Sequence, residues 1–263
     1  MPGVAPHRWL PLGLLLPALA WAEPRLAVLD LDNLTGDASF DGAGPGVAAV
    51  LTTKLSRIEA IEVVERQRLA AVQSEIELGA SGAVDAATAA RAGALLGADY
   101  LVTGALFSVQ LPAVAVDLRV IDSSTGQIVL ARQVRGTVGD SGEEFFVLLD
   151  QLSTELLDGL DIALSARDRI RLSQVDVERL NTVSVYGEAL DALAAGQQSE
   201  ARSLLAQAAA LEPGFALADE ALASIGQENS ARQTAIAHAA ITEGQRPTEQ
   251  ADECRASLPA LPE

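Results

Sequence analysis

RLAVLDLDNLTGD, residues 25–37, places a short apolar run directly before a cluster of turn-forming residues. The run over 25–31 is typical of a β-strand buried on both faces. Residues 32–37 are rich in Asp, Asn, Thr and Gly, which favour loops. The stretch therefore predicts a central strand that ends in a loop, and the elements on either side decide which kind of sheet this strand joins.

Helical and strand-like patterns alternate after this stretch. A Gly/Pro cluster at 42–46 precedes apolar residues spaced three and four apart as far as Ile58, which predicts an amphipathic helix that starts close to Pro45. Residues 62–64 predict a brief strand, and 65–78 return to helical spacing. An alanine-rich helix then ends at Gly97, where a helix C-cap glycine belongs.

Three further strands are predicted in succession, over 98–104, 114–121 and 127–134, with a turn at 122–126 between the last two. Consecutive strands with short links imply an antiparallel meander. A long amphipathic helix over 143–164 closes the domain. The predicted fold class is α/β, a mixed sheet with an antiparallel meander and helices packed on it, followed by a short α-helical region.

The C-terminal part divides by composition. We expect an α/β domain over 23–166, a charged linker over 167–180, helices over 181–243 and a disordered tail over 244–263. The helices are short and rich in alanine, so they bury little apolar area. We therefore expect 25–164 to fold alone and 180–225 not to do so.

The first 22 residues have the layout of a secretory signal peptide: Arg8, an apolar run over 9–19, and Ala20-Trp21-Ala22 as a cleavage site. The run is about half of the ~20 residues that a spanning helix needs. We expect cleavage after Ala22 and a periplasmic protein without a direct transmembrane segment; an uncleaved membrane anchor is the alternative. The only cysteine, Cys254, is far from the position that a lipid anchor requires.

Charge and residue usage exclude several classes of function. The net charge of -18 opposes binding to nucleic acid and docking on anionic lipid. The two histidines, His7 and His238, lie in the leader and near the C-terminus, which leaves the predicted domain without one for acid/base or metal chemistry.

Two stretches, one acidic and one glycine-rich, lack the ligand motifs that their composition suggests. The acidic run after residue 29 lacks the calcium-loop spacing, and the glycines at 42–46 lack the lysine and hydroxyl of a phosphate-binding loop. We predict no catalytic residue, no cofactor and no metal, and hence no enzyme. A nucleotide- or ligand-binding α/β enzyme is the alternative.

Four short motifs, at 26–37, 51–55, 63–66 and 97–104, occur in the order seen in one superfamily. The sequence resembles the curli-assembly (CsgG), TolB amino-terminal and FlgO-like domains. The resemblance implies an envelope protein that serves assembly, secretion or scaffolding, with protein partners in the periplasm or outer membrane and homo-oligomers as one form. The motif residues, with structural or partner-contact roles, are Asp30, Asn33, Gly36, Glu65, Arg66, Gly97, Asp99 and Gly104.

The chain departs from curli-pore proteins in two respects. It lacks the cysteine for a lipid anchor, and it has no inserted pair of ~10-residue alternating strands for a membrane barrel. We therefore favour a soluble, non-catalytic interaction protein in envelope biogenesis or secretion. An oligomeric outer-membrane channel component of the CsgG type is the alternative.

Residues 200–213 resemble the second helix of a tetratricopeptide repeat, with pattern positions at Ala201, Leu205, Ala208 and Pro213. Only about one and a half repeats fit, below the roughly three that a free-standing solenoid needs. We expect these helices to pack on the first domain or on a partner, and to bind a protein through the groove that such helix pairs present.

Overall fold

The structure is a computed structural model that describes residues 23–64, 86–110, 113–137, 143–173, 177 and 179–227. The strands are β1 (Arg25–Val28), β2 (Asp32–Leu34), β3 (Glu62–Val63), β4 (Tyr100–Gln110), β5 (Ala113–Asp122) and β6 (Ile128–Thr137). The helices are α1 (Ala43–Ser56), α3 (Ala86–Leu96), α4 (Glu143–Gly159), α5 (Ala166–Leu172), α6 (Leu180–Ala194) and α7 (Gln198–Leu211), followed by a helix over 216–227.

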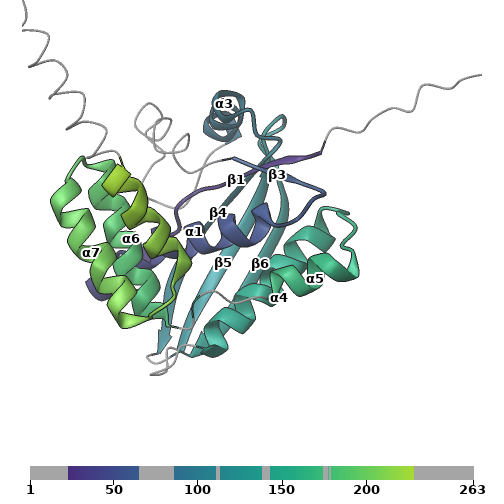
Figure 1. Cartoon of the computed structure of the whole chain (residues 1–263). Helices are drawn as coiled ribbons and strands as arrows, with labels where there is room; N and C mark the ends of the chain where they lie inside the picture. The colour runs from purple at the N-terminus through teal and green to yellow at the C-terminus, as the bar shows by residue number, and fades with distance from the viewer. Residues whose placement is uncertain are drawn as a thin grey trace, which may run out of the picture.

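One mixed sheet organises the α/β part, with the strand order β3-β1-β4-β5-β6 and β2 beside β4 (Figure 1). Strand β1 is parallel to β3 and β4, whereas β4, β5 and β6 form an antiparallel meander. Leu26, Ala27 and Val28 are at most 1% exposed, as expected for a strand covered on both faces. The predicted fold class is confirmed, including the meander and the helical C-terminal region.

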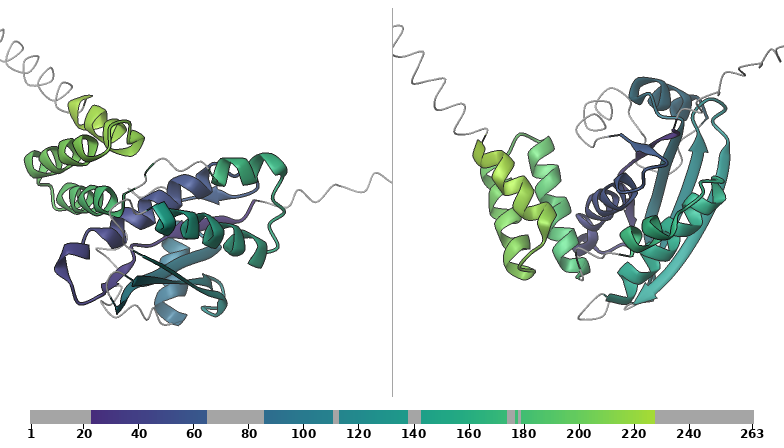
Figure 2. Two further views of the ribbon diagram at one scale, coloured as in Figure 1. Left: turned by 90° about the horizontal axis from the view of Figure 1, so that it is seen from below. Right: turned by 45° about the vertical axis from the view of Figure 1, so that its right-hand side comes forward.

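Alternation along the strands separates two layers of helices (Figure 2). Val116 and Leu118 of β5 point into a core shared with α1 and α4, and Ile121 joins a smaller core with Leu96 of α3 on the other face. Successive strand side chains point to opposite faces, so each face needs its own cover. The larger core also includes Val183 and Leu205, so the C-terminal helices share it with the α/β part.

The segment expected to be a linker, 167–180, is partly helical, because α5 occupies most of its first half. A capping box starts this helix: the Ser165 hydroxyl accepts from Asp168 N, and the Asp168 carboxylate accepts from Ser165 N. Leu172 is buried at its end. A single turn or two of helix has too few apolar positions for periodicity to reveal it.

Some expectations fall on residues outside the described part of the chain. These are the leader over 1–22, the helix over 65–78 with Glu65 and Arg66, and the tail over 244–263. In the ranges that the structure does describe, no helix combines the length and the apolar character needed to cross a bilayer.

Candidate protein-binding surface

Three glycines bring α1 and α6 into direct backbone contact. A Cβ added at Gly187 of α6 would lie 1.8 Å from the Gly42 carbonyl oxygen, and one added at Gly46 would lie 2.1 Å from the Val183 carbonyl oxygen. No side chain fits in these positions. The cluster at 42–46, predicted as a loop and helix start, does begin α1, at Ala43. Its further role is this contact, which we call the glycine seam (Gly42, Gly46 and Gly187).

The C-terminal helices, α6, α7 and 216–227, form one packed unit on the outside of α1 (Figure 1). Of the tetratricopeptide-like residues, Ala201, Leu205 and Ala208 are fully buried in α7, where α7 packs on α6. Pro213 is exposed in the turn that follows α7. Phe215 after this turn meets Tyr186 of α6 edge-to-face, with ring centroids 5.2 Å apart. The unit is therefore held by the buried alanines and leucine of α7 and by an aromatic pair.

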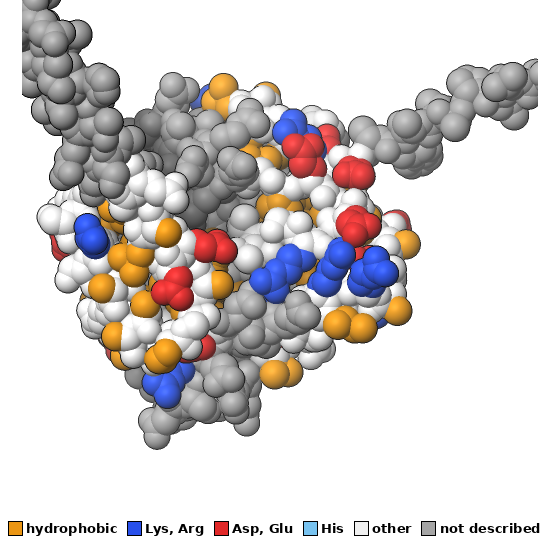
Figure 3. Space-filling model, in the orientation of Figure 1, with side chains coloured by type: hydrophobic (Ala, Val, Ile, Leu, Met, Phe, Trp, Pro, Cys, Tyr) orange, Lys and Arg blue, Asp and Glu red, His pale blue; other side chains and the backbone are white. Residues whose placement is uncertain are grey.

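The outer faces of α7 and of helix 216–227 are open to solvent. The exposed residues of α7 include Arg202, Ser203, Ala206 and Gln207, and those of the following helix include Asp219 and Glu220. Figure 3 shows apolar and acidic side chains side by side over these helices. A mixed surface of this kind has the composition that protein interfaces share with ordinary protein surface.

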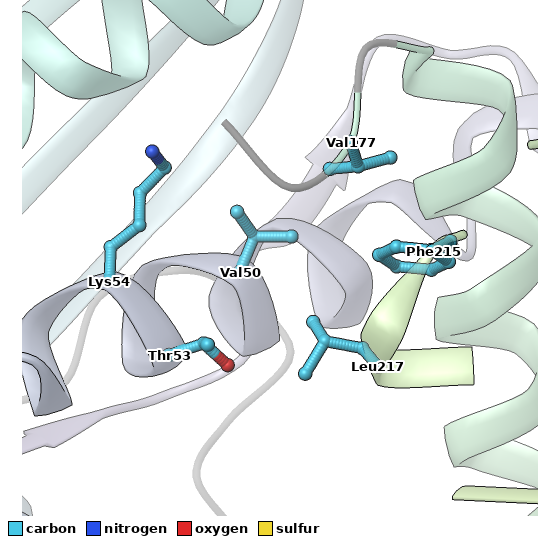
Figure 4. A pocket seen from close by; sticks show the side chains of 6 residues that line it. All are labelled: Val50, Thr53, Lys54, Val177, Phe215 and Leu217. Carbon is cyan, nitrogen blue, oxygen red and sulfur yellow. The ribbon is translucent and has the colours of Figure 1, made fainter. Parts of the chain in front are cut away.

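A small hollow of about 10 Å³ lies where α1 meets the C-terminal helices. Val50 and Thr53 of α1 form one side, and Phe215 and Leu217 form the other (Figure 4). The Thr53 hydroxyl donates to the Ala49 carbonyl at 3.0 Å, so this polar group is already satisfied. The hollow is an apolar junction between the two parts of the chain.

Lys54 also borders this hollow, but its side chain points away from Phe215 and Leu217 (Figure 4). Its Nζ contacts Asp150 Oδ1 of α4 and donates to the Leu172 carbonyl of α5 at 2.9 Å. Burial raises the pKa of Asp150, while the hydrogen bond and the charge of Lys54 oppose that rise. Lys54 thus joins three helices. Sequence reasoning placed it in a family motif without a role, although it is the chain's single lysine.

Two family-motif residues, Gly97 and Asp99, lie together at the start of β1. Asp99 Oδ2 accepts from Arg25 N at 2.9 Å, and Asp99 N donates to the Arg25 carbonyl at 2.8 Å. Gly97 has a φ of +64°, which lets α3 end and the chain turn into β4. Both residues hold β1 against β4, which is a structural role.

Asn33 lies in β2, and Gly36 lies in the loop between β2 and α1. The Asn33 amide donates to the Asp37 carbonyl at 2.9 Å and to Asp41 Oδ1 at 2.7 Å, which fixes the loop. Gly36 adopts a φ of +79° in it. The loop reaches the C-terminal helices, because the Ser184 hydroxyl of α6 donates to the Ser39 carbonyl at 3.2 Å.

The remaining motif residues stand apart from this loop. Asp30 is half-buried in the link between β1 and β2. Gly104 lies within β4, where an added Cβ would be 2.1 Å from the Asp117 carbonyl oxygen of β5. The described motif residues therefore do not converge on one site. Among the described residues, no group of three or more His, Cys, Asp or Glu side chains is arranged to hold a metal ion.

Comparison with known proteins gives one curated relative. The chain is 26% identical over 210 residues to a protein named putative adenylate cyclase 3 from Rhizobium meliloti (strain 1021), a match that covers 78% of this chain and 33% of that protein. The chain thus spans about a third of the length of the curated relative it matches.

The solved structures that the chain resembles are distant. The LpoB C-terminal domain from Salmonella enterica is 16% identical, with 44% of this chain and 83% of that one covered and a TM-score of 0.36. Lipoprotein GNA1162 from Neisseria meningitidis is 17% identical, with coverages of 54% and 99% and a TM-score of 0.35. A PelC dodecamer from Paraburkholderia phytofirmans is 18% identical, with coverages of 53% and 89% and a TM-score of 0.34.

A family match covers the strands, the glycine cluster and the motifs described above. Residues 16–110 and 108–148 match the family described as Curli production assembly/transport component CsgG. These segments together run from residue 16 to residue 148, half of the chain, and the resemblance seen in the four motifs is confirmed. The chain belongs to the CsgG family.

Proposed function

We propose that this protein is a non-catalytic assembly or secretion factor of the cell envelope, which holds a protein partner on its C-terminal helices. The family match supports an envelope-associated role in assembly or secretion. The glycine seam carries the rest of the proposal. It fixes α6 to α1 through the backbone, so the outer faces of α7 and of helix 216–227 are presented in a constant position.

The inner and outer faces of α7 differ in the way that this function needs. Ala201, Leu205 and Ala208 are used up in packing, whereas Ser203 and Gln207 face solvent. Small residues at a helix contact let two helices approach closely, and the remaining positions are free to recognise a partner, as in tetratricopeptide pairs. We assign the α/β domain the role of platform or oligomerisation surface.

The sequence of the first 22 residues is the basis for the location that we propose for this protein. We propose export, cleavage after Ala22 and a periplasmic mature protein, in accord with the composition of the leader and with the envelope role of the family.

The curated relative's name raises enzymatic activity as a second candidate. The matched portion is only a third of that relative, and the name belongs to the whole protein. We propose that the likeness concerns an accessory part of the relative, which leaves this chain without a cyclase reaction. Incubation of the mature protein with ATP and a divalent cation, followed by chromatography, tests this: the ATP should remain unchanged.

Photo-crosslinking tests the binding surface. A photoreactive amino acid at Ser203 or at Gln207, both exposed on α7, should capture one discrete partner in the envelope of living cells. The matched positions Glu62 and Ser124 are on the α/β domain and should not capture it. Capture of the same partner from Glu62 or Ser124 alone would place the binding surface on the α/β domain.

A further inference from the structure

Strand β6 is the last strand in the described part of the sheet, and no described strand pairs with its outer edge (Figure 2). The strand is ten residues long, and none of its described side chains is buried. Ile128 is 56% and Val129 48% exposed, at the point near the start of β6 where its register against β5 shifts by one residue. A long edge strand of this kind is a template for pairing with another extended chain.

The ladder determines which backbone groups of β6 face outward. Asp122 N donates to the Gln127 carbonyl at 2.9 Å, so the backbone of Asp122 in β5 is directed toward β6. Alternate residues of a strand bond to the same neighbour, so Leu118 also faces β6, where it is paired with Arg132. The residues between the bonded positions of β6 turn their N–H and C=O groups outward. These are Ala131, Gln133 and Arg135.

A side chain already occupies part of this edge. Arg132 Nη1 donates to the Ala131 carbonyl at 3.0 Å, which agrees with an outward direction for that carbonyl. Arg132 Nε also lies 3.3 Å from Glu155 Oε2 of α4, and both of these side chains are about 40% exposed. An incoming N–H would replace the arginine at the Ala131 carbonyl and free it to bind an acidic group.

Arginines flank the edge on both faces of the sheet. Arg132 is on the α4 side of the sheet. Arg135 shares a face with Gln133 and is therefore on the opposite side, because strand side chains alternate. Arg135 donates to Gln133 Oε1 at 3.0 Å, so its neighbour there is a neutral amide. In a chain of net charge -18, this edge thus carries two arginines, of which Arg132 is paired with Glu155 and Arg135 has a neutral hydrogen-bond partner.

A second copy of this chain is a poor occupant of the edge. Helix α4 packs chiefly on β6 rather than on β5. Antiparallel pairing of two β6 strands, about 4.8 Å apart, would bring two α4 helices together on one face, whereas packed helices need about 8–10 Å. It would also place four arginines around one seam. A single extended segment carries neither cost.

We propose that the outer edge of β6 is a docking site for an extended acidic segment of another protein, which adds as a further strand. Its backbone would bond to Ala131, Gln133 and Arg135, and its carboxylates would meet Arg132 on one face and Arg135 on the other. This site is separate from the C-terminal helices, and it stands or falls independently of the function proposed for them.

Substitutions at Gln133 separate backbone pairing from side-chain effects. Gln133→Pro removes an outward N–H without breaking a bond to β5, a change that edge strands tolerate. Gln133→Ala keeps the N–H and removes the side-chain bonds to Asp117 and Arg135, so it is the matched control. Arg135→Glu tests the charge, and Arg91→Glu on α3 is its control at another exposed arginine.

The probe is a fluorescein-labelled eight-residue peptide in which pairs of glutamates alternate with valine-threonine pairs, so that glutamates lie on both faces of the added strand. It is titrated with the mature protein at low salt. We expect saturable binding by anisotropy, unchanged within about twofold in Gln133→Ala and Arg91→Glu, and weaker by about tenfold or more in Gln133→Pro and Arg135→Glu. Hydrogen exchange should slow at the amides of residues 131, 133 and 135 when the peptide is bound. A lysine-for-glutamate peptide should not bind.

Three results would overturn the proposal. The first is the absence of saturable binding. The second is that the protein binds the glutamate and lysine peptides equally well, or that the Gln133→Pro and Gln133→Ala variants bind the glutamate peptide equally well. The third is a dimer in analytical ultracentrifugation without peptide that Gln133→Pro abolishes, because the edge would then belong to a second copy. Thermal melts of each variant confirm that a lost signal comes from the edge and not from unfolding.

Discussion

A single added methyl group would disrupt packing at three positions, Gly42, Gly46 and Gly187. Each added Cβ would approach a backbone oxygen to within 2.1 Å, and backbone cannot move aside as a side chain does. The clash involves two helices at once, so either α6 separates from α1 or one of them bends. The attachment of the C-terminal helices therefore depends on the absence of side chains.

We predict that Gly187→Ala lowers the free energy of unfolding by about 3 kcal/mol, at the upper end of typical overpacking effects. Gly226→Ala is the control, since an added Cβ there meets nothing within 4 Å and alanine favours a helix. Urea denaturation followed by circular dichroism measures both. Equal stability of the two variants would mean that the glycine seam accommodates a methyl group without loss of free energy of unfolding.

Lys54 carries a buried positive charge. It is 2% exposed and its partner Asp150 is largely buried. We predict that Lys54→Met costs about 3 kcal/mol, because it leaves a buried carboxylate without a counter-charge. The double variant Lys54→Met/Asp150→Leu should recover most of this loss. A double variant no more stable than Lys54→Met would contradict the explanation.

The same pair gives a pH dependence. Burial raises the pKa of Asp150, so the folded state holds this proton more tightly than the unfolded chain does. The resulting stabilisation is complete below the unfolded pKa of about 3.9 and is lost as the pH rises through the folded pKa. The deficit of Lys54→Met relative to wild type should therefore be smaller at pH 4 than at pH 8, as urea titrations at both values would reveal.

At the scale of elements, α5 depends on its first turn. Ser165 and Asp168 exchange hydrogen bonds there, and those bonds hold the pKa of Asp168 below its usual value. We predict that Ser165→Ala speeds hydrogen exchange in α5, and that Ser173→Ala, at the other end, has less effect. Acid should loosen α5 in wild type as the pH falls through the lowered pKa of Asp168, where the stabilising charge is lost.

Sequence patterns predicted the elements that repeat a simple period. Three features predict structure directly, and the fold contains all three: the apolar run at β1, the alternation in β5 and the turn after β5. The glycine seam and the Lys54 contacts were not predictable, because they join residues far apart in the chain. Gly46 and Val183 carry no local pattern that pairs them. The open edge of β6 likewise depends on strand order, which short-range periodicity does not determine.

At the scale of the whole molecule, one core links both parts of the chain. Val47 of α1, Leu152 of α4, and Val183 and Leu205 of the C-terminal helices belong to the same cluster. Removal of the C-terminal helices would uncover the glycine seam and the apolar surface around it. The sequence predicts that 25–164 folds alone, and this fragment would have to do so without the part of the core that the C-terminal helices supply.

We predict a single cooperative thermal transition for the mature chain, monitored by circular dichroism. A fragment of residues 23–173, which keeps α5, should melt at least about 10 °C lower, because it loses part of its core. Two resolved transitions in the full chain would show instead that the two parts unfold separately.

The proposed export also concerns the whole molecule. We predict that mass spectrometry of the protein from a periplasmic extract finds Glu23 as the first residue, since Ala20 and Ala22 suit the cleavage site. A variant with Ala22→Pro should retain the leader and remain with the membrane fraction. A wild-type protein that keeps Met1 would contradict periplasmic release.

The glycine seam has a mechanical consequence. Contacts between side chains yield under load, because rotamers can change before the backbone moves. Where Gly187 rests on the Gly42 carbonyl, there is no rotamer to change. A force applied to the C-terminal helices would be transmitted to α1 with little loss, and from α1 to the sheet. The molecule would therefore respond to load as one rigid body.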